Sequence, residues 1–231
     1  MSEAKSEFID LIRRVVKGEV DDVSRRLVAE PSLATVASNV GATRQNATSF
    51  FFSEIAHYLY YGDTALHMAA AAFQRPICEL LVQHGADRRA KNRNGAEPLH
   101  YAADTNHWDP IAQAETIEYL LSIGADPDAR DRLGVAPMHR AVRTRSGPAV
   151  RTLLDGGADP RIRNKSGSTP LHLAVQTTGR GGSGSEHARE QQADIIKLLL
   201  ERGATPKDTD GRGRQVLQAA TSEWIRDLLQ K

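Results

Sequence analysis

Apolar side chains recur at helical spacing in four stretches of the chain. In each stretch, leucine, isoleucine or valine residues lie three or four positions apart, with polar residues between them. Each stretch runs into a glycine followed by alanine, and glycine is the residue that most often ends a helix. The pattern therefore predicts four amphipathic helices, within ICELLVQHGAD, TIEYLLSIGAD, VRTLLDGGAD and IIKLLLERGAT, which end at Gly85, Gly124, Gly157 and Gly203.

A second recurring segment precedes each of these helices. Its four copies are GDTALHMAA from Gly62, GAEPLHYAA from Gly95, GVAPMHRAV from Gly134 and GSTPLHLAV from Gly167. Thr64 and Thr169 are suited to cap a helix, and Pro170 stands at the first helical position, where its missing N–H does no harm. Small alanines after the histidine let two helices approach closely. The unit of this sequence is therefore a pair of helices.

Together the two segments resemble the ankyrin repeat, both in the T-P-L-H-x-A signature and in a period near 33 residues. Glu97 and Ala136 depart from the signature, because the family has threonine there, so we expect their two helices to begin less firmly. The resemblance implies an all-α ankyrin-repeat solenoid of about six helix pairs in a single domain, 1–231. Its expected parts are an N-terminal cap over 1–40, an aromatic insertion over 41–61, four repeats over 62–209 and a C-terminal cap over 210–231.

The spacing of the repeats locates the insertions. The signature glycines are separated by 33, 39 and 33 residues, and the distances from signature histidine to closing glycine are 18, 24, 18 and 31. The second and fourth repeats therefore carry extra residues between their first and second helices. The third insertion, 41–61, comes before the first full repeat. Elaborations on a regular array are the natural places for specific function.

The insertion over 41–61 is unusually aromatic. Six of the twelve aromatic residues of the chain lie between residues 50 and 61. One interpretation is that they fold back over the joint between cap and first repeat. The other is a half-exposed platform that anchors a partner or covers a pocket, with Tyr58 and Tyr61 as contacts. The two are compatible, since three successive phenylalanines cannot all face one way.

The other two insertions carry polar groups. The second repeat has an acid, an imidazole and an indole close together, and the fourth has the run GRGGSGS. The insertion of the second repeat is either a surface turn or a binding loop. The insertion of the fourth repeat is either a flexible linker or a nest of N–H groups around an anion. The candidate binding residues are Tyr58, Tyr61, Asp104, His107, Trp108, Arg143, Arg145, Gln176, Thr177 and Arg180.

Equivalent positions of neighbouring repeats stack, so we expect Asp104, Arg143, Arg145, Gln176 and Arg180 to form one polar strip flanked by His107 and Trp108. The resemblance places this strip on the concave groove. The window 129–165 contains nine basic and three acidic residues. This local excess suits an acidic partner. The alternative is a set of solvated surface charges.

The case for chemistry is weak. By resemblance, His67, His100, His139 and His172 are structural. His84 stands near a helix C-terminus and His187 in the glycine- and serine-rich run, so His57 and His107 are the remaining candidates. No cysteine and histidine spacing matches a zinc site, so we expect no metal. Cys78 lies on an apolar helix face and is expected in the core. If an anionic substrate is turned over, the candidate catalytic residues are His57, Asp104, His107 and Arg143. No nucleophile motif can be assigned, so the sequence leans against an enzyme and leaves the question open.

Composition limits the class of partner and the compartment that we expect for this chain. A net charge of +1 disfavours nucleic acid, and a single cysteine excludes an internal disulfide and suits a reducing compartment. No apolar run approaches the roughly 18 residues of a membrane span, so we expect a cytoplasmic protein without membrane contact or cofactor. We expect a protein-interaction module or scaffold whose concave, locally basic groove binds an acidic or extended segment of another protein. The alternative is a small anionic ligand, or an unusual enzyme, with a pocket formed by the three inserted loops.

Overall fold

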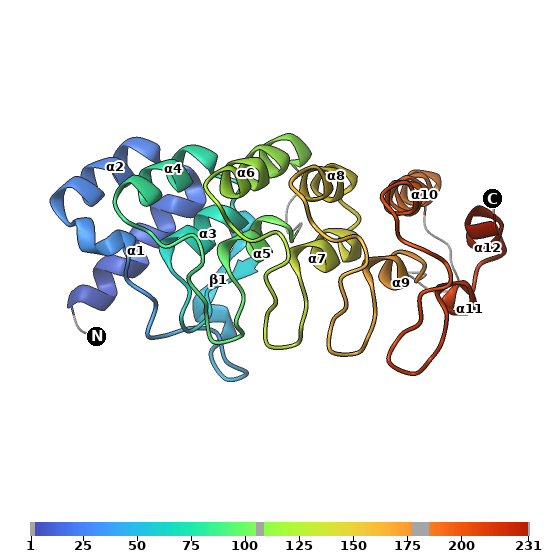
Figure 1. Cartoon of the computed structure of the whole chain (residues 1–231). Coiled ribbons are helices and arrows are strands. Elements are labelled where there is room, and N and C mark those ends of the chain that lie inside the picture. The colour runs from blue at the N-terminus through green and yellow to red at the C-terminus, as the bar shows by residue number, and fades with distance from the viewer. Residues whose placement is uncertain (1–2, 105–108, 177–184, 231) are drawn as a thin grey trace. The chain divides into compact units, whose positions relative to one another are not determined.

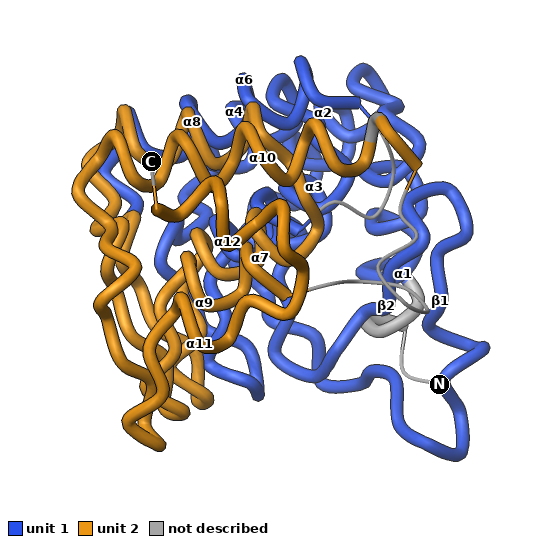
Figure 2. The backbone as a smooth tube through the Cα atoms, turned by 90° about the vertical axis from the view of Figure 1, so that its right-hand side faces the viewer, with its two compact units in different colours: residues 1–126 blue, residues 127–231 orange. Residues whose placement is uncertain are grey.

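The structure is a computed structural model that describes residues 3–104, 109–176 and 185–230. It divides the chain into two compact units, residues 1–126 and 127–231 (Figures 1 and 2). Both units are built from helix pairs joined by loops, which confirms the all-α repeat fold. The expected single domain, with its caps and four repeats, stays a prediction. No helix in the described ranges is long and apolar enough to cross a membrane.

The first unit stacks its helices in two layers (Figure 1). In one layer α3 packs between α1 and α5, and in the other α4 packs between α2 and α6. Fully buried leucines such as Leu66 and Leu81 fill the space within and between the pairs. The helices of this unit are α1 (Glu3–Lys17), α2 (Val20–Ala29), α3 (Ala65–Ala71), α4 (Arg75–Gln83), α5 (Pro98–Ala102) and α6 (Pro110–Ser122).

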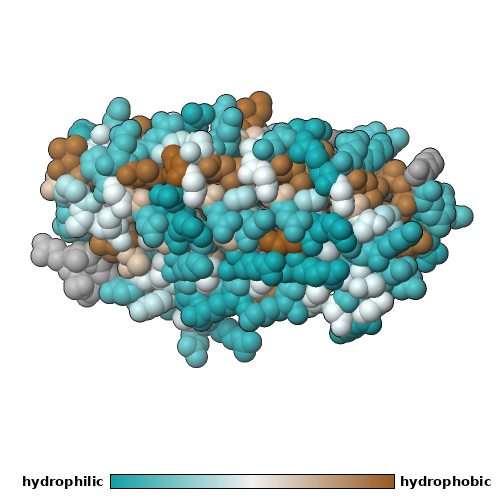
Figure 3. Space-filling view, in the orientation of Figure 1, coloured by the Kyte–Doolittle hydropathy of each residue, from teal (hydrophilic) through white to brown (hydrophobic). Residues whose placement is uncertain are grey.

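The second unit repeats the arrangement. Here α9 packs between α7 and α11, while α10 packs against α8 and α12. Leu153, Leu171 and Ile196 are fully buried in its core. Hydrophilic side chains cover most of the molecular face in Figure 3. The helices of this unit are α7 (Pro137–Arg143), α8 (Gly147–Asp155), α9 (Pro170–Ala174), α10 (Glu186–Glu201), α11 (Val216–Ala219) and α12 (Glu223–Gln230).

The aromatic insertion folds as a small hairpin in the first unit. It contains η2 (Ala47–Phe50), β1 (Phe51–Phe52), η3 (Ser53–Ile55) and β2 (His57–Tyr58), after a short turn, η1 (Pro31–Ala34). The two strands are antiparallel, with Phe51 opposite Tyr58 and Phe52 opposite His57. Because side chains alternate along a strand, one cross-strand pair faces inward and the other outward. Phe52 and His57 are buried, whereas Phe51 is 43% exposed.

The signature histidines join neighbouring repeats, as the resemblance implied. The Nδ1 atom of His172 accepts the backbone N–H of Thr169 at 3.2 Å, so the ring proton lies on Nε2. Nε2 then donates to a carbonyl of the next loop, which for His172 is Arg214 at 3.4 Å. His139 donates in the same way to Ser168 at 3.1 Å, and burial lowers the pKa values of both imidazoles. These rings are therefore neutral structural links.

The last repeat replaces this histidine with glutamine. The Oε1 atom of Gln218 accepts the backbone N–H of Gln215 at 3.0 Å, as Nδ1 of histidine does in the earlier repeats. The start of α11 is therefore held by the same type of bond, although the side chain that makes it cannot be protonated near neutral pH. This natural replacement supplies a matched variant for tests of the histidines.

A backbone bond closes the first helix in the repeats with short connections. In the first repeat the N–H of Gln74 donates to the carbonyl of Ala69, and in the third the N–H of Ser146 donates to Ala141, both at 3.0 Å. The turn that makes this bond possible contains a left-handed residue, Arg145 in the third repeat, with φ of 60°. The residue after it is the N-cap of the second helix.

Side chains close the first helix in the two repeats with longer connections. The second helix there begins earlier, so the equivalent position lies inside it and holds a glutamine. Gln113 Nε2 donates to the Ala102 carbonyl at 2.9 Å, and Gln192 Nε2 donates to the Ala174 carbonyl at 2.6 Å. Both glutamines are almost completely buried, with 1% and 5% of their surface exposed. A side-chain amide thus takes the place of the main-chain donor.

Candidate functional site

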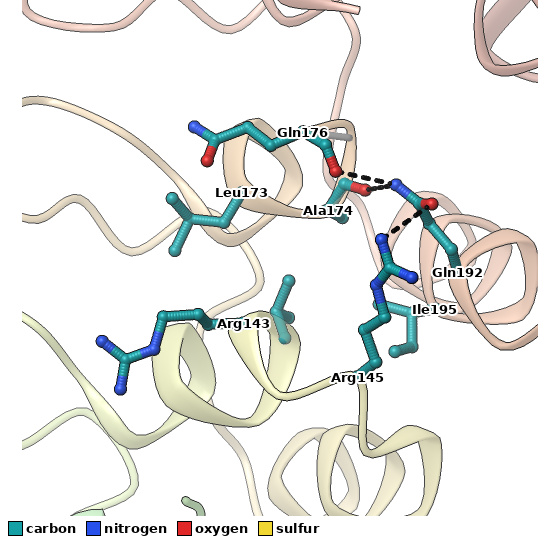
Figure 4. Close-up of a pocket in the computed structure, with 8 residues that line it drawn as sticks. Arg143, Arg145, Leu173, Ala174, Gln176, Gln192 and Ile195 are labelled. Atoms are coloured by element: carbon teal, nitrogen blue, oxygen red, sulfur yellow. Dashed lines mark hydrogen bonds between the residues drawn. The ribbon is translucent and has the colours of Figure 1, made fainter. Parts of the chain in front are cut away.

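The second unit contains a hollow of about 80 Å³ at the ends of α7 and α9 and beside α10 (Figure 4). We call it the basic hollow. Two arginines are its charged side chains, and four of the other six lining residues are apolar. The lining residues are Val142, Arg143, Arg145, Leu173, Ala174, Gln176, Gln192 and Ile195.

Arg145 enters the basic hollow from the left-handed turn between α7 and α8. Its side chain is partly buried, and one of its guanidinium nitrogens, Nη2, donates to Gln192 Oε1 at 3.3 Å. Burial lowers the pKa of the Arg145 guanidinium from its usual value, although the group remains charged at physiological pH. The described residues provide no carboxylate within ion-pair distance of it. The site therefore contains a partly desolvated positive charge.

Gln192 fixes the back of the basic hollow. Its amide nitrogen donates to both the Ala174 carbonyl and the Gln176 carbonyl, the latter at 3.1 Å (Figure 4). These two bonds turn its Oε1 atom toward Arg145. The amide thus links the end of α9 to the turn that follows α7.

The rest of the lining combines charge with apolar contact. Arg143 is exposed on the last turn of α7, and Gln176 is exposed just after α9. Val142 and Ile195 are buried and line the same hollow. Cations beside an apolar lining suit a ligand that has an anionic head and a short aliphatic stem.

Three of the residues predicted for the polar strip therefore come together in the second unit, namely Arg143, Arg145 and Gln176. Asp104 lies in the first unit, just after α5, and is 9% exposed. A strip that joins Asp104 to the arginines stays a prediction. The remaining predicted members, His107, Trp108, Thr177 and Arg180, lie outside the described residues.

The aromatic hairpin presents a second candidate surface, in the first unit. The rings of Phe51 and Tyr58 lie 4.9 Å apart, and Tyr58 and Tyr60 are 6.2 Å apart. The guanidinium carbon of Arg93 lies 5.2 Å from the centre of the Tyr60 ring, in a cation–π contact. Tyr61 is 54% exposed. The hairpin thus covers the interior with one face and presents aromatic rings with the other.

The candidate catalytic residues that the structure describes are His57, Asp104 and Arg143. His57 belongs to β2 of the hairpin and is buried on its inner face, where its ring meets Tyr101 edge to face at 4.7 Å. This setting favours a packing role. Arg143 and Asp104 belong to different units, so no acid–imidazole–arginine arrangement is described. Cys78 is completely buried, which raises the pKa of its thiol far above the ordinary value, so it is a core residue rather than a nucleophile.

Metal-ligating side chains do not gather in groups of three or more anywhere in the ranges that the structure describes. A buried carboxyl is present at Glu97, which is 1% exposed at the start of α5. Its Oε1 atom lies 3.6 Å from Lys91 Nζ, and its Oε2 atom has no hydrogen-bond partner in the described chain. Burial raises the pKa of Glu97, which identifies it as a costly substitution for the threonine of the signature.

Sequence reasoning missed Gln192. Glutamine within a helix has no distinctive pattern, and the notable composition of the fourth repeat lies in its glycines. One signal was available. Gln113 and Gln192 each stand eleven residues before a closing glycine, Gly124 or Gly203, in the two repeats whose connections are long.

Comparisons with known proteins agree with this architecture. A family model described as ankyrin repeats in three copies matches residues 35–131 and 110–210. The Notch-regulated ankyrin repeat-containing protein B of Danio rerio is 42% identical over 50 residues, which is 22% of this chain. That match covers 45% of the relative, so the similarity spans less than half of the relative's length.

Proposed function

Because the chain belongs to the ankyrin-repeat family, which indicates a protein-interaction module, we propose that its second unit binds an acidic, extended segment of another protein. The observation that carries this proposal is that Arg143 and Arg145 line the basic hollow together with four apolar residues. Their charge attracts an acidic segment, and the apolar lining contributes contact area.

The local charge of the second unit supports the same partner. The window 129–165 contains nine basic and three acidic residues, although the net charge of the chain is only +1. A concentrated local charge favours a partner of complementary charge over nonspecific attraction to polyanions. The concave, locally basic groove expected from the resemblance is part of this proposal.

Tyr58 and Tyr61 are proposed as a further contact. Exposed aromatic rings are frequent anchors in protein interfaces because they bury much area at little entropic cost. Tyr61 is 54% exposed, so its replacement by serine is expected to lower the affinity for the partner without lowering the melting temperature of the chain. Equal binding by Tyr61→Ser would remove this tyrosine from the interface.

A small anionic ligand is the second candidate. The hollow, at about 80 Å³, is large enough for a carboxylate or phosphate group. Titration calorimetry with inorganic phosphate and with citrate tests this candidate. Tight binding of either anion alone would favour a metabolite site over a protein groove.

The main test is selection of peptides from a random displayed library against the full chain. We expect enriched peptides to carry aspartate or glutamate next to aliphatic residues. For a selected peptide, Arg143→Ala is expected to weaken binding by about 1–3 kcal/mol, the usual value of a charged hydrogen bond. Arg151→Ala is the matched control, because Arg151 is an exposed arginine on α8 outside the hollow.

Two results would contradict the proposal. One is a selection that yields no peptides, or only neutral and basic ones. The other is an equal effect of Arg143→Ala and Arg151→Ala on an acidic peptide, since general charge attraction would then explain the binding.

A further inference from the structure

We infer that Arg145 determines the specificity of the basic hollow by pairing with a glutamate side chain of the bound segment. Gln192 is the residue that positions Arg145 for this contact. The inference rests on the proposed protein-binding function and adds the chemistry of the anchor to it. Four features of the basic hollow support it: backbone strain, desolvation, a fixed amide and an apolar lining.

The backbone of Arg145 is strained for an arginine. Its φ of 60° lies in the left-handed region, where glycine or asparagine would be less strained. The equivalent residue of the first repeat, Phe73, has φ of 55°, and its buried side chain explains why a large residue stands there. Arg145 is only partly buried. Packing therefore explains less of the strain at Arg145, and strain kept without full burial points to function.

The guanidinium of Arg145 has lost water without gaining a counter-charge from the residues that the structure describes. Its side-chain partner is the neutral Oε1 of Gln192, at 3.3 Å. A guanidinium has five N–H donors, and this bond uses one of them. A bound carboxylate would accept two of the others and compensate the buried charge.

Gln192 holds the guanidinium in place. Its amide nitrogen is committed to the carbonyls of Ala174 and Gln176, at 2.6 and 3.1 Å, so its oxygen cannot turn away from Arg145 without breaking both bonds. The fork of Arg145 is thus oriented before a ligand arrives. An oriented donor loses less freedom on binding than a mobile one.

The apolar lining of the hollow favours glutamate over aspartate. Val142, Leu173 and Ile195 line the hollow together with the arginines. A carboxylate that binds Arg145 in the hollow would place its stem against this apolar lining. Glutamate has two methylene groups for this contact and aspartate has one, and each buried methylene favours binding.

The experiment uses the full chain and a labelled acidic peptide from the selection, with versions in which its glutamate is aspartate or glutamine. Arg145→Gly is the informative variant, because glycine removes the guanidinium and relieves the strained φ. We expect fluorescence anisotropy to show at least tenfold weaker binding, while the melting temperature does not fall. The Glu→Gln peptide should bind the native chain at least tenfold more weakly, and Glu→Asp severalfold more weakly.

A double-mutant cycle identifies the pair. If Arg145 contacts this glutamate, the Arg145→Gly chain should bind the glutamate and glutamine peptides equally. Gln192→Leu tests positioning, because loss of orientation reduces the preference for glutamate over glutamine. A purely structural defect would weaken both peptides by the same factor.

The possible failures are distinguishable. If acidic peptides bind and Arg145→Gly leaves their affinity unchanged, the inference is wrong and the proposed function stands. Additive effects in the cycle would also overturn it, since Arg145 would then act elsewhere. If no acidic peptide binds the native chain, the proposed function fails and the inference fails with it. Equal competition by inorganic phosphate and by the glutamate peptide would show a general anion site and overturn the preference for glutamate.

Discussion

The side-chain amide of Gln192 lies 2.6 Å from the carbonyl oxygen of Ala174, where the repeats with short connections have a backbone N–H. Gln113 makes the same contact with Ala102. The end of each first helix is therefore satisfied in all four repeats, although by two different donors. A buried carbonyl without a donor is costly, so the substitution of one donor for the other has measurable consequences.

Replacement of either glutamine by leucine should destabilise the chain. Gln113→Leu and Gln192→Leu leave a buried carbonyl unpaired, which costs about 1–3 kcal/mol. The control is Gln191→Leu, because Gln191 is only partly buried and next to Gln192 on α10. Urea unfolding followed by circular dichroism measures the three free energies. Equal stability of the Gln191 and Gln192 variants would show that the amide bond contributes little.

Stability should fall as the solution becomes acidic. Burial lowers the pKa values of His139 and His172 below the ordinary 6.5, so the unfolded chain binds their protons more readily than the native chain. The contribution of these rings is complete above pH 6.5 and is lost as the pH falls through the native pKa values. Urea unfolding at several pH values between neutral and mildly acidic measures the slope.

His172→Gln isolates one of these rings. Glutamine makes the equivalent bond at Gln218, so the variant is expected to fold and to lose part of the pH dependence. If the His172→Gln chain retains the full slope, His172 is not a source of the acid sensitivity. A stability that rises on acidification would contradict the lowered pKa values themselves.

Glu97→Thr should stabilise the first unit. The change restores the threonine of the signature and removes a buried carboxyl, and we expect a gain of about 1 kcal/mol at neutral pH. Burial raises the pKa of Glu97 above 4.5, so the native chain loses stability as the pH rises through that pKa. The gain should therefore shrink in acid. Ala136→Thr is the control, because it restores the same threonine without removing a charge and should show no such pH dependence.

Cys78 should report opening of the first unit. It is the single cysteine of the chain and is completely buried, with a raised thiol pKa. A thiol reagent such as DTNB reacts with the exposed thiolate, so the native chain should react very slowly. In concentrated guanidinium chloride one thiol per chain should react at once. Fast reaction of the native chain would show that α4 opens readily.

The repeat fold could be predicted from the sequence because the same local signals recur in each of the four repeats. The histidine at the start of the first helix and the glycine after the second helix are local signals, since each side chain or backbone angle acts within a few residues. Gly85, for example, has φ of 90° as its place after α4 requires. The bonds of His139 and His172 to the next loop follow from the same repetition.

The site was harder to predict because it depends on contacts between distant residues. Arg143, Arg145 and Gln176 were chosen by their equivalent places in neighbouring repeats, and the structure places all three at one hollow. Gln192 escaped notice because its role depends on the length of the connection before it. The left-handed backbone angle of Arg145 could not be predicted either, because arginine carries no sequence signal for a positive φ, as glycine does.

The glutamine bonds have a practical consequence for protein engineering. Because Gln113 and Gln192 satisfy the end of the first helix from the second helix, the bond that closes each of these two pairs joins described residues on either side of the connection. A designed repeat with a long connection can therefore be given a glutamine eleven residues before its closing glycine, as a side-chain donor in place of the backbone N–H.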